Sequence, residues 1–313
     1  MRVALLGGTG FVGSYLVDAL LERGHQPSLL VRAGSEGKVR QAAACRTVSG
    51  DVSEDSSIRD LLTRCDAVIY NVGILREDPA AGVTFDELQY RAPLRTIAAA
   101  VELGVGRFLL MSANGAAPSG TPYQRSKYGA EEALLESGLD YSIFRPSVIF
   151  GDPRGRDEIS TRLYRQMIRP PLPAAWFHTG LWPSAASVRL SPVHVRDVAD
   201  AFVAALEDPG TVGRTLRLGG PEALSFKTML ERIAATVGKR KLMLPVPIPL
   251  MSIVAELFDR WSWFPVTRDQ LSLLAAGNVV PDGVLRQLIG REPRTFSARH
   301  LGYLEAPGVA ARG

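Results

Sequence analysis

Short apolar runs alternate with helical patterns along the first half of the chain. Brief apolar runs bounded by turn residues are typical of buried strands, and an apolar repeat near the helical period is typical of amphipathic helices. Expected strands cover residues 3–6, 27–31, 46–48, 67–72, 107–111 and 141–150. Expected helices cover residues 13–23, 56–62, 85–103 and 126–137. This alternation predicts right-handed crossovers and a doubly wound α/β fold, in which helices cover both faces of a parallel sheet and ligands bind at the carboxyl ends of its strands.

Three glycines, Gly7, Gly10 and Gly13, separate the first expected strand from the first expected helix. Such a spacing permits a tight turn, a close approach of backbone to a pyrophosphate, and close packing of helix on sheet. The phosphates then lie at the helix N-terminus, where free N–H groups and the dipole favour negative charge. Because the motif lies between a strand and a helix, a dinucleotide-binding Rossmann fold is expected. The contacts expected in this turn are Gly7, Thr9, Gly10, Phe11, Val12 and Gly13.

The pattern changes after Gly151, where prolines gather at 170–173 and again at 245–249. A helix is expected at 193–206 and a strand at 214–218, which resumes the alternation of helices and strands seen in the first half. Two domains are therefore expected: residues 1–150 form an NAD(P)-binding domain, and residues 151–313 form a smaller C-terminal lobe for substrate or partner, partly interleaved with the first.

Arg32 follows the second expected strand, where an acidic residue would bind the ribose 2′-hydroxyl of NAD. An arginine instead suits the 2′-phosphate of NADP, with Ser35 and Lys38 as helpers, so NADP(H) is favoured over NAD(H). A solvated loop arginine is the alternative. Further cofactor contacts are expected after the third and fourth strands, at Asp51 and Val52 beside the adenine and at Asn71, Val72 and Gly73 beside the central part of the cofactor.

Tyr123 and Lys127 lie four residues apart near the start of a helical segment, so one helix face carries both. A phenol ordinarily ionises near pH 10, too high for efficient proton transfer at neutral pH. A neighbouring ammonium is expected to lower that pKa, which would let the pair move the proton that accompanies hydride transfer. The alternative is an exposed tyrosine with a solvated lysine.

Taken together, these two motifs resemble the extended and atypical branches of the short-chain dehydrogenase/reductase superfamily. The segment Arg145–Gly151 resembles the stretch that those branches place beside the nicotinamide, which implies cofactor contacts at Pro146, Ser147 and Val148. Within the superfamily, Val72–Leu75 and Met111–Ala113 are most similar to the dehydrogenase-like accessory subunits of respiratory complex I (alpha-subcomplex subunit nine). The resemblance implies cofactor binding more firmly than catalysis.

One catalytic position departs from that family. Its catalytic members place a serine or threonine just after the fifth strand to polarise the substrate oxygen. Here Ser112 lies at the strand end itself, and Asn114 or Ser119 is the alternative polariser. Tyr123, Lys127 and Ser112 are therefore the expected catalytic residues.

Composition narrows the class without naming a function. The chain has 313 residues, of which 46% are hydrophobic and 22% charged, which excludes a disordered or fibrous protein. The net charge of +4 suits an anionic cofactor or membrane surface and is too diffuse to indicate nucleic acid. Cys45 and Cys65 have no metal-ligand spacing, so no metal and a reducing, cytoplasmic compartment are expected. No apolar run is long enough to span a bilayer.

A C-terminal stripe at helical spacing follows the basic segment Lys239–Lys241. Its members are Leu250, Ile253, Val254, Leu257, Phe258 and Trp261. Core packing is the favoured interpretation, while a site at the inner face of a membrane or a pocket for a quinone-like substrate remains open.

These observations favour an NAD(P)H-binding oxidoreductase that acts on a small apolar carbonyl or quinone-related substrate. The alternative is an NADPH-bound, non-catalytic structural or assembly factor of a membrane quinone or respiratory system. A nucleotide-sugar epimerase or dehydratase is a weaker alternative, because the C-terminal lobe is too apolar for a sugar diphosphate. The oligomeric state stays open.

Overall fold

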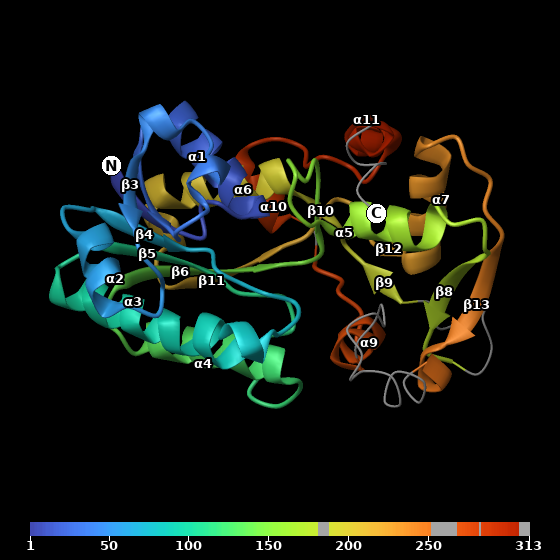
Figure 1. The fold of residues 1–313 in the computed structure, drawn as a ribbon, viewed down its shortest axis with the longest axis horizontal. Helices are drawn as coiled ribbons and strands as arrows, with labels where there is room; N and C mark the ends of the chain where they lie inside the picture. Colours follow the sequence, from blue (N-terminus) through green and yellow to red (C-terminus); the bar gives the residue numbers. More distant parts are fainter. Residues whose placement is uncertain (181–187, 252–267, 282, 307–313) are drawn as a thin grey trace. The chain divides into compact units, whose positions relative to one another are not determined.

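The computed structural model describes residues 1–180, 188–251, 268–281 and 283–306. The chain divides into two compact units (Figure 1). The first comprises Met1–Pro146, Val195–Leu218 and Val284–Gly290, and the second Ser147–His194, Gly219–Gly283 and Arg291–Gly313. Among the described residues, no helix has the length and apolar character needed to cross a bilayer.

A seven-stranded parallel sheet forms the centre of the first unit, in the order β11-β6-β5-β4-β1-β2-β3. Its strands are β1 (Arg2–Leu6), β2 (Gln26–Val31), β3 (Arg46–Ser49), β4 (Ala67–Tyr70), β5 (Arg107–Met111), β6 (Asp140–Pro146) and β11 (Arg214–Leu218). Because β1 pairs with both β2 and β4, the strand order reverses there, and the carboxyl end of β1 is the usual ligand position of such a sheet. The predicted doubly wound α/β fold is confirmed.

Helices cover both faces of this sheet (Figure 1). One layer holds α1 (Phe11–Glu22), α6 (Val195–Glu207) and α10 (Val284–Ile289), and the other holds α2 (Asp55–Leu62), α3 (Ala92–Glu102) and α4 (Pro122–Leu135). A π-helical turn, η4 (Glu87–Arg91), leads into α3. Short 3₁₀ turns are η1 (Glu36–Lys38), η2 (Ala42–Ala44), η3 (Pro79–Ala81) and η6 (Pro209–Thr211).

Two expected boundaries were wrong by four residues. The strand expected at 141–150 ends at Pro146, which has no N–H to extend the ladder. Residues Ile149–Phe150 form a separate strand, β7, which pairs with β10 (Val193–His194) in the second unit. Helix α4 begins at Pro122 rather than at Ser126, because Thr121 and Gln124 form a capping box at its N-terminus.

The second unit packs short strands and helices around its own apolar core. Its further elements are α5 (Ile159–Leu163), η5 (Tyr164–Ile168), β8 (Ala174–His178), β9 (Arg189–Leu190), β12 (Leu224–Ser225), α7 (Phe226–Thr236), β13 (Met243–Pro247), α9 (Arg268–Ala275), α11 (Ala298–Leu301) and η7 (Gly302–Glu305). Strands β8 and β13 pair in parallel, and β9 and β12 antiparallel. Phe150, Phe226 and Phe296 are among the buried side chains of the core.

Candidate functional site

The turn after β1 requires glycine at two positions. Gly7 has φ 86°, and a Cβ there would lie 2.8 Å from the carbonyl oxygen of Asn71 at the end of β4. A Cβ on Gly13 would lie 2.0 Å from the carbonyl oxygen of Gly7, so the first turn of α1 packs directly against the loop. A Cβ on Gly10 would meet only the Gly7 carbonyl oxygen, at 3.3 Å. Two glycines therefore shape the turn, and the third leaves room above it.

The N-terminus of α1 opens onto that room. Gly10 is its N-cap and supplies no side-chain cap, and no acidic residue lies in the first turn. Free backbone N–H groups at the end of a long helix attract an anionic group, so these residues fit the pyrophosphate of a dinucleotide. Thr9, Phe11 and Val12 are half-buried in the same turn.

Arg32 lies immediately after β2 and is exposed. Its carbonyl oxygen accepts a hydrogen bond of 2.9 Å from the Ser35 N–H, which turns the loop back on itself, and Lys38 follows in η1. The arginine is available to an anionic group at this strand end, so its predicted role beside a 2′-phosphate stays a prediction.

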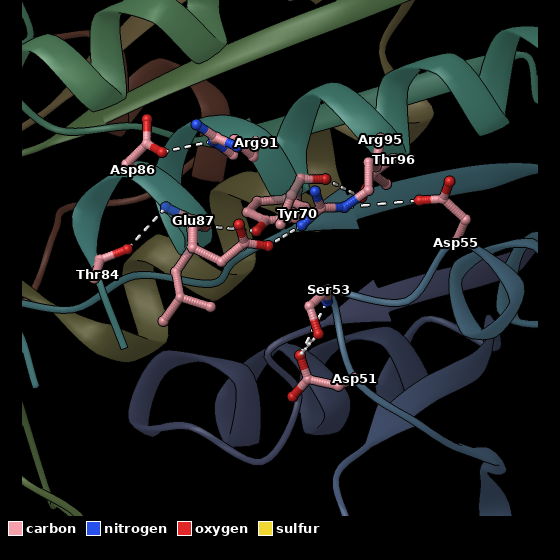
Figure 2. Close-up of polar contacts among 12 residues, drawn as sticks. Asp51, Ser53, Asp55, Tyr70, Thr84, Asp86, Glu87, Arg91, Arg95 and Thr96 are labelled. Atoms are coloured by element: carbon pink, nitrogen blue, oxygen red, sulfur yellow. Dashed lines mark hydrogen bonds and ion pairs between the residues drawn. The ribbon is translucent and has the colours of Figure 1, made fainter. Parts of the chain in front are cut away.

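Asp51 and Val52 follow β3. The Asp51 carboxylate accepts hydrogen bonds from the N–H and hydroxyl groups of Ser53, at 2.9 and 2.8 Å (Figure 2). Val52 is buried in the core of the unit. The loop is thus held by its own side chains, and its predicted contact with adenine is untested.

A polar cluster near this loop has no counterpart in the sequence predictions. Tyr70 ends β4, is fully buried and donates a hydrogen bond of 2.7 Å to the carbonyl oxygen of Leu88. Burial raises the pKa of its phenol well above the usual value. Arg95 on α3 forms ion pairs with Glu87 and, at 3.7 Å, with Asp55 (Figure 2). These residues fix η4 and α3 against the start of α2.

Lys127 is buried on α4 at the carboxyl ends of two neighbouring strands. Its Nζ donates hydrogen bonds to the carbonyl oxygens of Met111, at 3.0 Å, and Val72, at 3.4 Å. A Cβ on Gly73 would lie 3.3 Å from Nζ, so only a small residue fits beside it. Burial lowers the pKa of Lys127 to about 8, and the charge of Glu131 opposes that shift. The structure therefore brings Lys127 together with two of the predicted cofactor residues.

The expected lowering of the Tyr123 pKa by Lys127 was wrong. Tyr123 lies in the first turn of α4, with its ring edge-on to Phe85 at a centroid distance of 5.7 Å. Burial raises the pKa of Tyr123 to about 12 rather than lowering it. The lysine ammonium is hydrogen-bonded to backbone carbonyls, and the burial of the phenol sets the direction of its pKa shift.

Ser112 faces a buried carboxylate. Its hydroxyl donates a short hydrogen bond to Oε1 of Glu131, which lies one helical turn after Lys127. Glu131 also accepts two hydrogen bonds from Arg145 on β6, one of them at 2.9 Å from Nε. This ion pair raises the pKa of Arg145. The spacing of Tyr123, Lys127 and Glu131, each four residues on, was a readable signal for Glu131 that the sequence analysis missed.

The alternative polarisers differ in their surroundings. Asn114 is half-buried, and its N–H donates to the carbonyl oxygen of Pro146 at 3.0 Å. Ser119 is exposed in the loop before α4. Neither role is tested by the geometry.

The predicted residues after β6 belong to the second unit. Ser147 donates a hydrogen bond of 2.7 Å to the carbonyl oxygen of Asn278, and the Val148 carbonyl accepts one of 2.9 Å from Val193. Their cofactor contacts stay predictions. Of the predicted stripe, Leu250 is exposed. Ile253, Val254, Leu257, Phe258 and Trp261 lie outside the described residues.

The strand order and the glycine turn define the class: a dinucleotide-binding protein of the doubly wound α/β type. A family model for NAD(P)H-binding proteins matches residues 7–166, and the chain belongs to that family. The predicted resemblance to atypical short-chain dehydrogenase/reductases and to the complex I accessory subunits is confirmed.

Relatives include both a respiratory subunit and reductases. The chain is 26% identical, over 301 residues, to NADH dehydrogenase [ubiquinone] 1 alpha subcomplex subunit 9 of Arabidopsis thaliana, which covers 90% of this chain and 71% of that protein. It is 27% identical over 271 residues to divinyl chlorophyllide a 8-vinyl-reductase of Oryza sativa subsp. indica, covering 82% of this chain and 64% of the reductase. It is 25% identical over 261 residues to ceramide reductase of Caulobacter vibrioides, covering 83% of this chain and 78% of that reductase. Reductases among the relatives support an oxidoreductase in general terms.

Solved structures share the fold. The crystal structure of gox2253 matches with a TM-score of 0.73 at 22% identity, covering 96% of each chain. MoeE5 in complex with UDP-glucuronic acid and NAD matches with a TM-score of 0.71 at 19% identity, covering 99% of each chain.

Proposed function

We propose that the protein is an NADPH-dependent reductase of a small apolar carbonyl or quinone-related substrate. One observation carries the proposal: the buried ammonium of Lys127 is held by the carbonyls of Val72 and Met111, one helical turn after Tyr123, in a chain of the NAD(P)H-binding family. The named reductases among the relatives support the same class of reaction.

Each part of the first unit has a role in that proposal. The turn at Gly7–Gly13 and the N-terminus of α1 bind the pyrophosphate, and Arg32 binds the 2′-phosphate. Lys127 binds the nicotinamide ribose, since its ammonium lies at the carboxyl ends of β4 and β5. The bound cofactor supplies a hydride.

The raised pKa of Tyr123 favours the role of proton donor in that proposal. With a pKa raised to about 12, its phenol is protonated at neutral pH and serves as an acid. In the reduction, hydride adds to the carbonyl carbon, the C=O π bond breaks, and the phenolic proton of Tyr123 goes to the oxygen. Water then returns a proton to the phenolate. Alcohol oxidation would need that phenolate beforehand, and burial opposes it.

The decisive experiment follows NADPH absorbance with a panel of quinones, aldehydes and ketones. Tyr123→Phe should keep cofactor affinity and lose turnover by about 10²-fold or more, because general acid catalysis contributes at least that much. Tyr128→Phe, on the next turn of the same helix, is the matched control and should keep full activity. Activity that survives Tyr123→Phe on a true substrate would refute the proton-donor role.

The NADP preference has a separate test. Arg32→Ala should weaken NADPH binding by about tenfold or more, as expected for a lost hydrogen bond between charged groups, and leave NADH binding unchanged. Equal affinities of the unmodified protein for NADPH and NADH would rule out the assignment to Arg32.

A second function is favoured by the hydroxyl of Ser112, which is bound to Glu131 rather than free to polarise a substrate. In that case the chain is an NADPH-bound structural or assembly factor of a membrane quinone or respiratory system, and the cofactor stabilises the fold by mass action. Tightly bound NADPH that no acceptor oxidises, with recovery of the protein in a membrane complex, would select this function.

A further inference from the structure

The two most exposed leucines of the second unit lie on neighbouring segments. Leu172 is 70% exposed and Leu242 is 66% exposed, more than any other large apolar side chain of the described residues. The Ala174 N–H donates a hydrogen bond of 2.8 Å to the Leu242 carbonyl oxygen, so the segments before β8 and β13 run side by side. Leu244, which lies in β13 two residues after Leu242, is 46% exposed. Leu172 therefore lies on a segment that runs beside the segment of Leu242 and Leu244.

Four cations border these leucines. Arg169 and Arg240 are exposed and form no ion pair with any carboxylate in the described part of the chain. Lys239 donates a hydrogen bond of 3.3 Å to the Arg169 carbonyl oxygen, and Lys241 donates one to that of Pro170. These bonds satisfy the ammonium groups and leave their charge in place. We call Leu172, Leu242, Leu244, Arg169, Lys239, Arg240 and Lys241 the leucine–cation patch.

The sequence around the patch has no compensating acid. No Asp or Glu occurs from residue 159 to 196 or from residue 232 to 255, so both contributing segments are positive or neutral throughout. The lysine–carbonyl hydrogen bonds also fix the two segments to each other, and the leucines on them are exposed. Exposed leucines beside several cations have the complementary chemistry of an anionic lipid surface.

We infer that the leucine–cation patch attaches the protein to the surface of an anionic bilayer. The cations contact lipid phosphates and carboxylates, and the leucines enter the boundary between headgroups and acyl chains. This attachment goes beyond the proposed function and does not depend on it, since it involves neither the cofactor turn nor α4.

The test is co-sedimentation of the full chain with vesicles. The protein should pellet with vesicles of phosphatidylcholine and phosphatidylglycerol and remain in solution with phosphatidylcholine alone. Binding should fall when salt is raised to about 1 M, where the Debye length shrinks to about 3 Å.

Two variants separate charge from apolar contact. Arg169→Gln/Arg240→Gln removes cations whose side chains make no hydrogen bond or ion pair within the described structure, and should weaken binding by about fivefold per cation. Leu172→Ser/Leu242→Ser should weaken it by about tenfold. The matched controls, Arg214→Gln/Arg217→Gln and Leu103→Ser/Leu135→Ser, change exposed residues of the first unit and should bind as the unmodified protein does.

Three results would overturn the inference. They are no binding to phosphatidylglycerol vesicles, equal loss of binding in the patch and control variants, and retention on heparin without binding to vesicles, which would assign the patch to an acidic polymer. Cofactor binding, measured on the same variants, is expected to be unchanged and shows that they are folded.

Discussion

The glycine turn after β1 and the buried cluster of Ser112, Glu131 and Arg145 belong to the same unit, yet they were not equally predictable. In the turn, close backbone contacts require glycine, because a Cβ on Gly13 would overlap the Gly7 carbonyl. In the cluster, Ser112, Glu131 and Arg145 are joined by buried charge and hydrogen bonds. The spacing of glycines in the sequence therefore predicts a tight backbone turn. The spacing of polar residues does not predict which partner a buried polar side chain contacts.

Removing the carboxylate of the cluster is expected to give the largest loss of stability. Glu131→Ala leaves Arg145 without its partner, and should lower the free energy of unfolding by about 4 kcal/mol, as for other broken buried ion pairs. Urea unfolding measures the loss. Glu132→Ala, at the exposed neighbouring position, should change it by less than about 0.5 kcal/mol. Equal effects of the two variants would mean that the cluster contributes no more than a surface charge.

The buried charge of Lys127 should appear as a pH dependence of stability. Its pKa is about 8 in the folded protein against 10.5 in the unfolded chain, so between these values the unfolded chain binds more protons. Stability contributed by Lys127 therefore rises with pH across this window, by about 3 kcal/mol in total. Urea unfolding of the unmodified protein and Lys127→Met at several pH values gives the difference. Parallel curves for the two proteins would contradict the low pKa.

Substitutions in the glycine turn test the steric role of its backbone contacts. Gly13→Ala should destabilise the fold by about 2 kcal/mol, because its Cβ has no room beside Gly7. Gly10→Ala should keep the fold, since its Cβ lies 3.3 Å from its nearest neighbour, and should weaken dinucleotide binding by obstructing the approach of the phosphates. Thermal unfolding with and without NADPH distinguishes the two. An unaltered affinity in Gly10→Ala would place the pyrophosphate elsewhere.

Ser112→Ala is expected to have the smallest effect. It removes one hydrogen bond to Glu131 and should cost about 1 kcal/mol of stability, with turnover nearly unchanged. A loss of turnover near 10²-fold, with the fold intact, would show that Ser112 leaves Glu131 to polarise the substrate.

The strands were predictable because buried apolar runs have few alternatives. The expected 107–111 strand matches Arg107–Met111, and 27–31 differs from Gln26–Val31 by one residue. The early start of α4 was readable from Thr121 and Gln124. The position of Lys127 Nζ could not be predicted from the sequence. A shared helix face does not determine whether the end of a long side chain contacts Tyr123 or a backbone carbonyl.

The order in which the first unit is assembled along the chain has a consequence for its synthesis. Strand β11 and helix α10 complete this unit, yet they follow long segments that belong to the second. Until β11 has been made, the β6 edge of the sheet is bare, and an unpaired edge of this kind is prone to association. The nascent chain must therefore protect that edge until β11 emerges, and expression of the first 150 residues alone would yield an aggregating fragment.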